Sequence, residues 1–145
     1  MSFRSMRCRE CGRGRVRSVA KSGRFQRYQG ALLRVPAKLK IPTCDACGEE
    51  WVDGPTAEKL ESALSTIYRK RAAQIIARAM KAVRHYARQK SMSLASIEAL
   101  LGMSTGYLSR LRAERREPSA ALVNELALIG KDPRRLRELE KVWEQ

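Results

Sequence analysis

The spacing of apolar residues along the chain changes from a period of two near the N-terminus to periods of three and four. One segment alternates apolar residues with polar or proline residues, at Val35, Ala37, Leu39 and Ile41. A period of two predicts a β-strand. Pro36 and Pro42 would restrict this strand to a sheet edge, because proline has no N–H to donate to a neighbour. Gly23 and Gly30 predict turns before it.

The next stretch, residues 57–90, contains neither Gly nor Pro, and its apolar residues recur at steps of three and four. This spacing predicts a helix. Thr56 would cap its start, and Glu58 would lie in the first turn, where a negative charge is favourable. Because so long a helix is unusual in a globular protein, we expect a break near residues 69–71.

The last third of the chain has short apolar groups separated by Gly, Ser and Pro, which predicts several short helices. Ser93 would cap a helix over Leu94–Leu101 that ends at Gly102. Ser104 would cap a second helix over Thr105–Ala113.

Two more helices are expected after this pair. Pro118 and Ser119 would open a helix that reaches Gly130, and Asp132 would cap the last helix with Pro133 at its first position. An apolar stripe follows on the last helix, at Leu136, Leu139, Val142 and Trp143. The predicted fold class is α+β in several parts, with a small β-rich N-terminal module followed by an all-α domain of about five helices.

The chain has 145 residues, enough for one domain or two small ones. It carries 30 basic and 15 acidic side chains, a net charge of +15, which indicates a polyanionic partner and nucleic acid first. Residues 1–56 hold twelve basic and five acidic residues, 57–90 nine and two, and 91–145 nine and eight, which gives +7, +7 and +1. With no long apolar run and no apolar segment after the basic N-terminus, we expect a cytoplasmic, nucleoid-associated protein without membrane contact.

The motif Cys-x-x-Cys-Gly occurs twice, at residues 8–12 and 44–48. Two residues between the thiols let both sulfurs point into one tetrahedron, and the following Gly lets backbone N–H groups face them. We therefore predict one structural Zn²⁺ ion with no open coordination position, held by Cys8, Cys11, Cys44 and Cys47. Disulfides, a redox motif and an iron–sulfur cluster are less favoured alternatives.

Two short capped helices joined by residues 102–104 are typical of a helix-turn-helix, whose second helix enters the major groove of DNA. Arg110 is the candidate for base recognition, because a guanidinium matches guanine O6 and N7. Thr105, Tyr107 and Ser109 are expected to contact phosphate or thymine. Further phosphate candidates are Arg112, Arg115 and Arg116. The alternative is a generic helical hairpin with a solvated charged face.

One face of the helix over residues 57–90 is expected to be basic. This basic face consists of Arg71, Arg78, Lys81, His85 and Arg88. The lack of interspersed acidic residues favours contact with DNA or an acidic partner, and a merely solvated face is the alternative. His85 is the only histidine, and no nucleophile–base arrangement or carboxylate pair stands out, so enzymatic activity is not expected.

Two segments resemble known families. Residues 92–119 resemble the Cro/cI-type (XRE) helix-turn-helix, through Ser93, Ile97, Leu101-Gly102, Ser104, Leu108-Ser109-Arg110 and Pro118-Ser119. The two cysteine motifs resemble the YgiT-type zinc finger, together with Val35-Pro36-Ala37 before Cys44 and the closing Cys47-Gly48-Glu49-Glu50. A zinc finger followed by an XRE domain is the arrangement of MqsA-like antitoxins.

This resemblance implies a sequence-specific repressor that dimerises through its C-terminal domain and binds a small ribonuclease toxin with its zinc domain. The base-recognising Arg of the family falls on Arg110, whereas its partner Asn falls on Gly106. Leu94 stands where a phosphate-binding Gln is common, Glu98 where Ala is common, and Arg112 where Glu is common.

We therefore expect a zinc-binding module at 1–56, a linker helix at 57–71 and an XRE-type DNA-binding domain at 72–145. The expected function is that of a transcriptional repressor, an antitoxin that controls its own promoter as a homodimer on double-stranded operator DNA. The alternative is a protein-interaction adaptor, whose zinc module binds a toxin or the transcription machinery while DNA binding is incidental.

Overall fold

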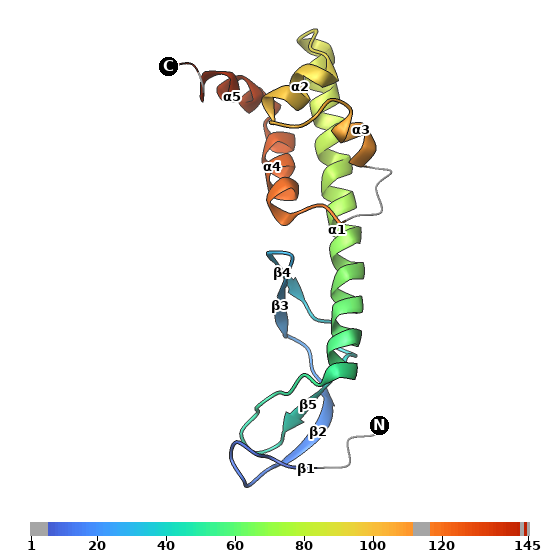
Figure 1. Ribbon diagram of the computed structural model, residues 1–145, viewed down its shortest axis with the longest axis vertical. Helices are drawn as coiled ribbons and strands as arrows, with labels where there is room; N and C mark the ends of the chain where they lie inside the picture. Colours follow the sequence, from blue (N-terminus) through green and yellow to red (C-terminus); the bar gives the residue numbers. More distant parts are fainter. Residues whose placement is uncertain (1–5, 112–116, 143, 145) are drawn as a thin grey trace. The chain divides into compact units, whose positions relative to one another are not determined.

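The computed structural model describes residues 6–111, 117–142 and 144. The chain divides into two compact units, which we call the N-terminal unit (Met1–Tyr68) and the C-terminal unit (Arg69–Gln145). The predicted fold class is confirmed, because strands occupy the first part of the chain and five α-helices follow (Figure 1). No described helix has the length and apolar character needed to cross a membrane.

The long helix α1 spans Gly54–Gln89, so the division between the two units falls within it. The predicted break near residues 69–71 is therefore wrong: the backbone stays helical there. The physical reason is composition, since residues 57–90 hold no Gly or Pro and are rich in Ala, Arg and Lys, which are good helix formers.

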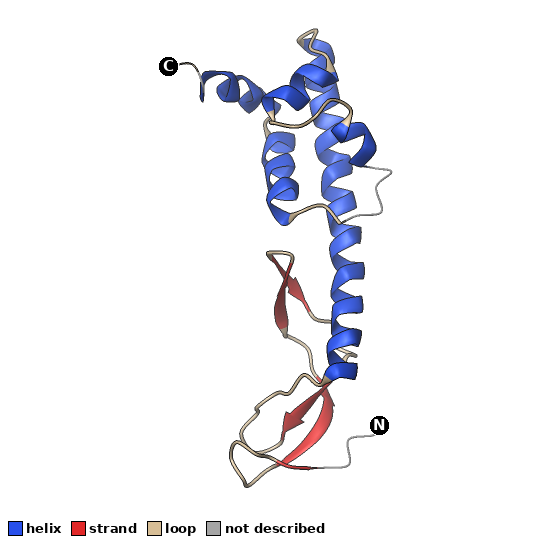
Figure 2. Cartoon of the chain, viewed as in Figure 1, coloured by secondary structure: helices blue, strands red, loops and turns tan. Residues whose placement is uncertain are grey.

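Two small antiparallel sheets form the β-rich part of the N-terminal unit (Figure 2). The first has the strand order β1-β2-β5. Its strands are β1 (Met6–Arg7), β2 (Arg15–Ala20) and β5 (Lys40–Cys44). The second sheet is a hairpin of β3 (Phe25–Tyr28) and β4 (Ala31–Arg34).

The strand predicted from the alternation of residues 34–41 is wrong over most of its length. Residues 35–39 form a connection, in which the Leu39 N–H donates to the Pro36 carbonyl at 3.0 Å. Val35 is buried although it lies outside a strand, so part of the apolar pattern reflects burial of a loop. Pro42 does lie in an edge strand, β5, as expected for a residue without an N–H.

The hairpin turn depends on two residues with left-handed backbone conformation. Gln29 and Gly30 have φ of 51° and 86°, and the turn joins the paired residues Tyr28 and Ala31. A two-residue loop with positive φ at both positions is the type I′ turn that matches strand twist. Tyr28 then packs on Tyr68 of α1 with ring centroids 5.6 Å apart, which ties the hairpin to the helix within the N-terminal unit.

The start of α1 differs from the prediction. Asp53 caps the helix, because its carboxylate accepts the Thr56 N–H at 2.9 Å and its carbonyl accepts the Ala57 N–H at 2.8 Å. Hydrogen bonds from the Thr56 side chain and from its backbone N–H lower the pKa of Asp53. Thr56 is therefore inside the helix and does not cap it, and no acidic residue lies in the first turn, so the role predicted for Glu58 is also wrong.

The C-terminal unit contains the end of α1 and four further α-helices. They are α2 (Leu94–Leu100), α3 (Tyr107–Leu111), α4 (Ala120–Lys131) and α5 (Leu136–Val142), with a 3₁₀ turn η1 (Pro133–Arg135) before α5. The predicted caps Ser93 and Asp132 are confirmed, and Ser119, predicted to open α4, caps it. Each of these side chains accepts a backbone N–H two or three residues ahead.

The core of the C-terminal unit is apolar and tightly packed. Its completely buried side chains include Met80, Val83, Ile97, Leu108, Leu126 and Leu136. Helix α4 runs alongside the end of α1 (Figure 1). A Cβ atom at Gly130 would lie 2.7 Å from the Ala79 Cα, so these two helices approach closely only because both residues are small.

Candidate metal centre and candidate nucleic-acid interface

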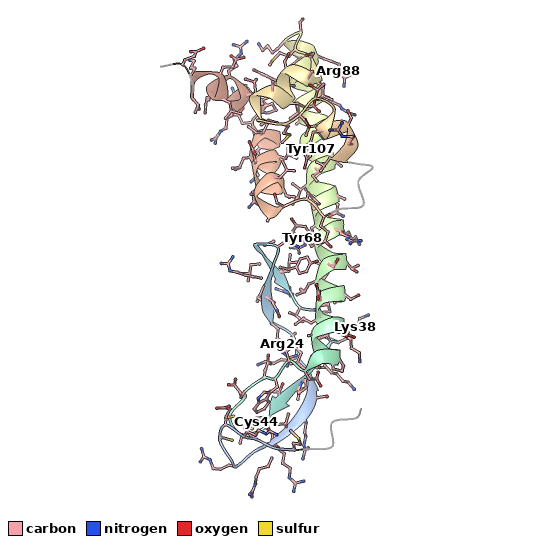
Figure 3. All side chains as sticks on the ribbon, viewed as in Figure 1. Arg24, Lys38, Cys44, Tyr68, Arg88 and Tyr107 are labelled. Carbon is pink, nitrogen blue, oxygen red and sulfur yellow. The ribbon has the colours of Figure 1, made fainter. Side chains whose placement is uncertain are left out.

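The four cysteines of the N-terminal unit come together and form the thiol cluster, Cys8, Cys11, Cys44 and Cys47. All four Sγ atoms lie within 4.8 Å of one another, with 3.7 Å between Cys8 and Cys47 and 3.8 Å between Cys11 and Cys44. These separations are far longer than the S–S bond of about 2.05 Å, so the cysteines are free thiols. Cys44, labelled in Figure 3, ends strand β5.

The two cysteine motifs fold in the same way. The Gly12 N–H donates to the Cys8 carbonyl at 3.0 Å, and the Gly48 N–H donates to the Cys44 carbonyl at 3.1 Å. Both glycines have positive φ, 63° and 74°, which an L-residue with a Cβ adopts only with strain. The glycine after each second cysteine therefore closes a tight turn.

Backbone N–H groups point at the sulfurs. Cys8 accepts from the N–H of Cys11, Cys11 from that of Gly14, and Cys44 from those of Ala46 and Cys47, at 3.3–3.5 Å. The hydrogen bond from Gly14 is the main cause that lowers the pKa of Cys11 to about 6, and the one from Cys47 is the main cause that lowers the pKa of Cys44.

The pKa of Cys47 shifts in the opposite direction to those of Cys11 and Cys44. A hydrogen bond from the Glu49 backbone lowers the pKa of Cys47, but desolvation and hydrogen bonds with the other three thiols outweigh it and raise this pKa to about 12. Four adjacent thiols cannot all ionise unless a cation compensates their charge. The four thiols therefore form a possible metal site.

The dimensions of the thiol cluster fit a single tetrahedral ion. Four sulfurs about 2.3 Å from a central zinc ion would lie about 3.8 Å from one another. The Cys8–Cys47 and Cys11–Cys44 separations of 3.7 and 3.8 Å agree with this value, and no pair of sulfurs is more than 4.8 Å apart. All four ligands are protein thiols, so a bound ion would have no coordination position open to a substrate.

Close packing holds the two motifs together. A Cβ atom at Gly14 would lie 2.6 Å from the Ala46 Cβ and would also contact the Cys44 sulfur. Trp51 is partly buried and packs against the cluster of Cys8, Val16 and Cys44.

An ion pair of the buried Arg24 with Glu50, missed from the sequence, forms between residues on either side of β5. Arg24 is 8% exposed, and its Nε donates to Glu50 at 2.7 Å. The same guanidinium also donates to the Val19 carbonyl at 3.2 Å and to the Thr43 hydroxyl at 3.3 Å. With these partners the charge of Arg24 is compensated although it is buried.

Helices α2 and α3 of the C-terminal unit form the predicted pair of short helices, but the second starts later than expected. The helix α3 begins at Tyr107 instead of Thr105, and Gly106 before it has φ of 80°. Ser104 does not cap it. Instead the carboxylate of Glu98 on α2 accepts the N–H of Gly106 at 2.8 Å and that of Leu108 at 2.9 Å.

The pattern of residues did not single out Glu98, which stands where the XRE family commonly has Ala, as a contact between the two helices. It is 1% exposed. Its position on α2 contained a signal, because it lies four residues after Leu94 and three before Leu101, at the spacing of a helix face that packs inward.

The side chains expected to contact DNA lie on the outer side of this helix pair. Thr105, Ser109 and Arg110 are exposed, and Tyr107, labelled in Figure 3, is half-buried. The Arg110 guanidinium folds back toward the turn, where it donates to the Ser104 hydroxyl at 3.3 Å and the Thr105 carbonyl at 3.5 Å. The other predicted contacts, Arg112, Arg115 and Arg116, lie outside the described residues.

The basic face of α1 is exposed at all five positions, Arg71, Arg78, Lys81, His85 and Arg88. Residues 69–90 hold eight Lys and Arg residues and no Asp or Glu. Arg69 is paired with Glu117 at 2.8 Å. The face therefore presents positive charge on a stretch, residues 69–90, that has no acidic residue.

A protein-family model described as "Antitoxin component of bacterial toxin-antitoxin system, MqsA" matches residues 6–140. The match leaves only five residues at each end of the chain, so it covers both the thiol cluster and the α2–α3 pair. A search of curated proteins gave no match.

Proposed function

The chain belongs to the MqsA antitoxin family, and we propose that it is a sequence-specific DNA-binding repressor that controls its own promoter. Membership of this non-enzymatic family agrees with the absence of enzymatic activity expected from the sequence. It also implies a toxin partner, which we propose to be a small ribonuclease.

The observation that carries the DNA-binding proposal is the geometry of the α2–α3 pair. The inner side of α3 is anchored through Leu108 and Leu111, which are 1% and 8% exposed, while Ser109 and Arg110 face outward. A short helix held in this way can enter a major groove and bring a guanidinium to guanine O6 and N7. Thr105, Tyr107 and Ser109 would then lie close enough to contact phosphate or thymine methyl groups.

The basic face of α1 supports a second, sequence-independent contribution. Residues 91–145, which contain α2 and α3, have a net charge of only +1, whereas residues 69–90 carry +8. Lys and Arg side chains gain affinity for DNA by releasing counterions from its phosphates, whatever the base sequence. We therefore assign base recognition to α3 and non-specific attraction to α1.

For the thiol cluster we propose one structural Zn²⁺ ion. Sulfur–sulfur separations of 3.7 and 3.8 Å and N–H groups directed at the thiolates support this assignment. The ion would cross-link the two cysteine motifs and so preserve the surface of the N-terminal unit, which we propose to bind the toxin.

We propose a homodimer, since two copies of α3 about one helical turn of DNA apart would match a palindromic operator. Leu139 of α5 is half-buried and lies in a groove of about 650 Å³ with Met92, Leu100 and Leu101. A second copy of the chain seated there would cover these apolar side chains. Sedimentation of Leu139→Asp tests the contact: we expect a monomer, and an intact dimer would place the interface elsewhere.

A footprint on the promoter of the chain's own gene tests the repressor function. We expect a protected palindrome. Arg110→Ala should weaken operator binding by about 1–3 kcal/mol and relax the preference at one base pair. Arg137→Ala, which removes an exposed arginine from α5, is the matched control and should bind like the wild type.

Two results would argue against this assignment. Equal loss of affinity by Arg110→Ala for operator and random DNA would show that Arg110 contacts phosphate only. Binding without any protected site, but with steep salt dependence, would favour a protein-interaction adaptor with incidental DNA binding.

A further inference from the structure

The carboxylate of Glu98 on α2 is buried, so a negative charge on it needs hydrogen-bond donors or a cation nearby. The residue is 1% exposed and follows Ile97, which is completely buried. Burying an ionised group without partners is costly, so the partners of a buried carboxylate indicate its role. Among the described residues, its two oxygens each accept one backbone N–H, those of Gly106 and Leu108.

These two hydrogen bonds join α2 to the start of α3. The first N–H groups of any helix lack a partner within the helix and need an acceptor from elsewhere. In α3 that acceptor comes from α2, eight and ten residues earlier in the chain. The backbone of Glu98 contributes as well, because its carbonyl accepts the Met103 N–H at 2.8 Å. Glu98 thus fixes the connection between α2 and α3 at three points.

The same connection holds Arg110. The Arg110 N–H donates to the Gly106 carbonyl at 3.0 Å, and its guanidinium donates to Ser104 and Thr105. A Cβ atom at Gly106 would lie 3.4 Å from Arg110 Nη1, so the turn and the side chain are in contact. Any movement of the turn would therefore move the guanidinium.

We propose that Glu98 is a positioning residue for DNA recognition, which sets the location of Arg110 by clamping the turn that carries it. This inference rests on the proposed repressor function. Bidentate recognition of a base tolerates only small errors in position, and such side chains need a rigid second layer of hydrogen bonds. Contacts with phosphate are less demanding, so loss of the clamp should reduce specific binding more than non-specific binding.

Glutamate is better suited to the clamp than its neutral isostere. An ionised carboxylate has two acceptor oxygens and no donor, whereas the amide of Gln has one acceptor oxygen and an NH₂ group. Glu98→Gln would keep the volume but would direct a donor at one of the two N–H groups. The change thus breaks half of the clamp without creating a cavity.

The test uses the full chain and compares Glu98→Gln with Glu138→Gln, an exposed control on α5. Affinities are measured by fluorescence anisotropy at one salt concentration for the footprinted operator and for scrambled DNA of equal length. We expect Glu98→Gln to lose about tenfold or more on the operator and less than twofold on scrambled DNA, as for loss of one base contact. In an Arg110→Ala background, the same change should cost less than threefold on the operator, because the residue through which it acts is gone.

A structural readout accompanies the affinities. In ¹H–¹⁵N spectra, the amides of Gly106 and Leu108 should shift in Glu98→Gln, while those of α4 should stay in place. If Glu98→Gln does not fold, Glu98→Asp replaces it, since the shorter carboxylate keeps the charge but cannot reach both N–H groups.

The outcomes separate this inference from the function on which it rests. Equal losses on both DNAs, or a loss unchanged by Arg110→Ala, would show that Glu98 only stabilises the fold and would overturn the proposal. If the wild type itself shows no preference for the operator, the repressor function fails and the inference fails with it. An amide shift at Gly106 and Leu108 would then remain as evidence of a structural clamp alone.

Discussion

The region around the thiol cluster and the C-terminal unit are stabilised by different means. Around the thiol cluster, the buried group consists of Cys8, Val16 and Cys44, with Trp51 partly buried beside it. The C-terminal unit instead buries large aliphatic side chains completely, such as Leu126 and Leu136. The few buried apolar side chains beside the cysteines need a cross-link, whereas a helical domain with an apolar core does not.

The charge of the units differs as well. The N-terminal unit has thirteen basic and seven acidic residues, a net charge of +6, and the C-terminal unit has seventeen and eight, a net charge of +9. Nearly all of the latter lies in residues 69–90, which carry +8. Within the C-terminal unit, positive charge is therefore concentrated in residues 69–90 and not on the helix proposed to recognise bases.

Removal of the metal should have the largest effect and should be confined to one unit. Structural zinc contributes about 10–16 kcal/mol in zinc-finger peptides at neutral pH. A strong chelator should therefore collapse the amide dispersion of residues 6–53 in ¹H–¹⁵N spectra, while that of residues 92–111 and 117–142 persists. Unchanged dispersion of residues 6–53 after verified metal removal would show that this module folds without a cross-link.

Loss of a buried apolar side chain from α4 should destabilise the C-terminal unit and leave the N-terminal unit folded. Leu126→Ala removes a completely buried side chain from α4 and should lower the free energy of unfolding of the C-terminal unit by about 2–5 kcal/mol. Leu128→Ala is the matched control, because Leu128 is on the same helix but 55% exposed. Urea unfolding followed by circular dichroism at 222 nm measures both.

Equal stability of both leucine variants would show that burial of Leu126 does not stabilise the C-terminal unit. Release of the bound metal by Leu126→Ala would show that the two units unfold together.

Several features that depend on neighbouring residues were predictable from the sequence, although the cap of α1 was assigned to Thr56 instead of Asp53. The Cys-x-x-Cys-Gly motifs, and the caps Ser93, Ser119 and Asp132, each involve atoms a few residues apart, so residue type and spacing determine them. The gathering of four cysteines into one cluster followed from the duplicated motif, because an isolated pair of thiols cannot complete a tetrahedron.

Features that depend on distant partners were not predictable in this way. Arg24 pairs with Glu50 at a separation of 26 residues, and Glu98 caps a helix that starts nine residues later. The sequence contains an unremarkable arginine and an unremarkable glutamate at these positions. Their roles arise only when packing removes them from water and forces each charge to find a partner.

Neutralising the basic face should weaken DNA binding without changing its specificity. A triple variant, Arg78→Gln, Lys81→Gln and Arg88→Gln, removes three exposed charges from α1. If all three contact phosphate, the slope of log K against log salt concentration should fall by about 2.7, since each contact contributes about 0.9. Operator and scrambled DNA should lose affinity to the same extent.

The matched control removes three exposed charges from elsewhere in the C-terminal unit, with Lys131→Gln, Arg135→Gln and Arg137→Gln. An identical slope for both triple variants would mean that only net charge matters. An unchanged slope in the α1 variant would mean that the basic face is merely solvated, and the positive charge of the N-terminal unit would then have to supply the attraction.

The cap at the start of α1 should give the smallest effect and a characteristic pH dependence. Its hydrogen bonds with Thr56 lower the pKa of Asp53 below its usual value of 3.8. A lowered folded-state pKa means that the cap stabilises the helix fully above about pH 4 and loses this effect as the pH falls through the lowered pKa.

Asp53→Ala should therefore speed exchange of the Thr56 amide roughly fivefold at neutral pH. Asp53→Asn, which can still accept the Thr56 N–H, should restore much of the protection without the pH dependence. If wild type and Asp53→Ala exchanged alike at neutral pH, residues 53–56 would be held by packing of the buried Thr56, and the cap would contribute nothing to the boundary between sheet and helix.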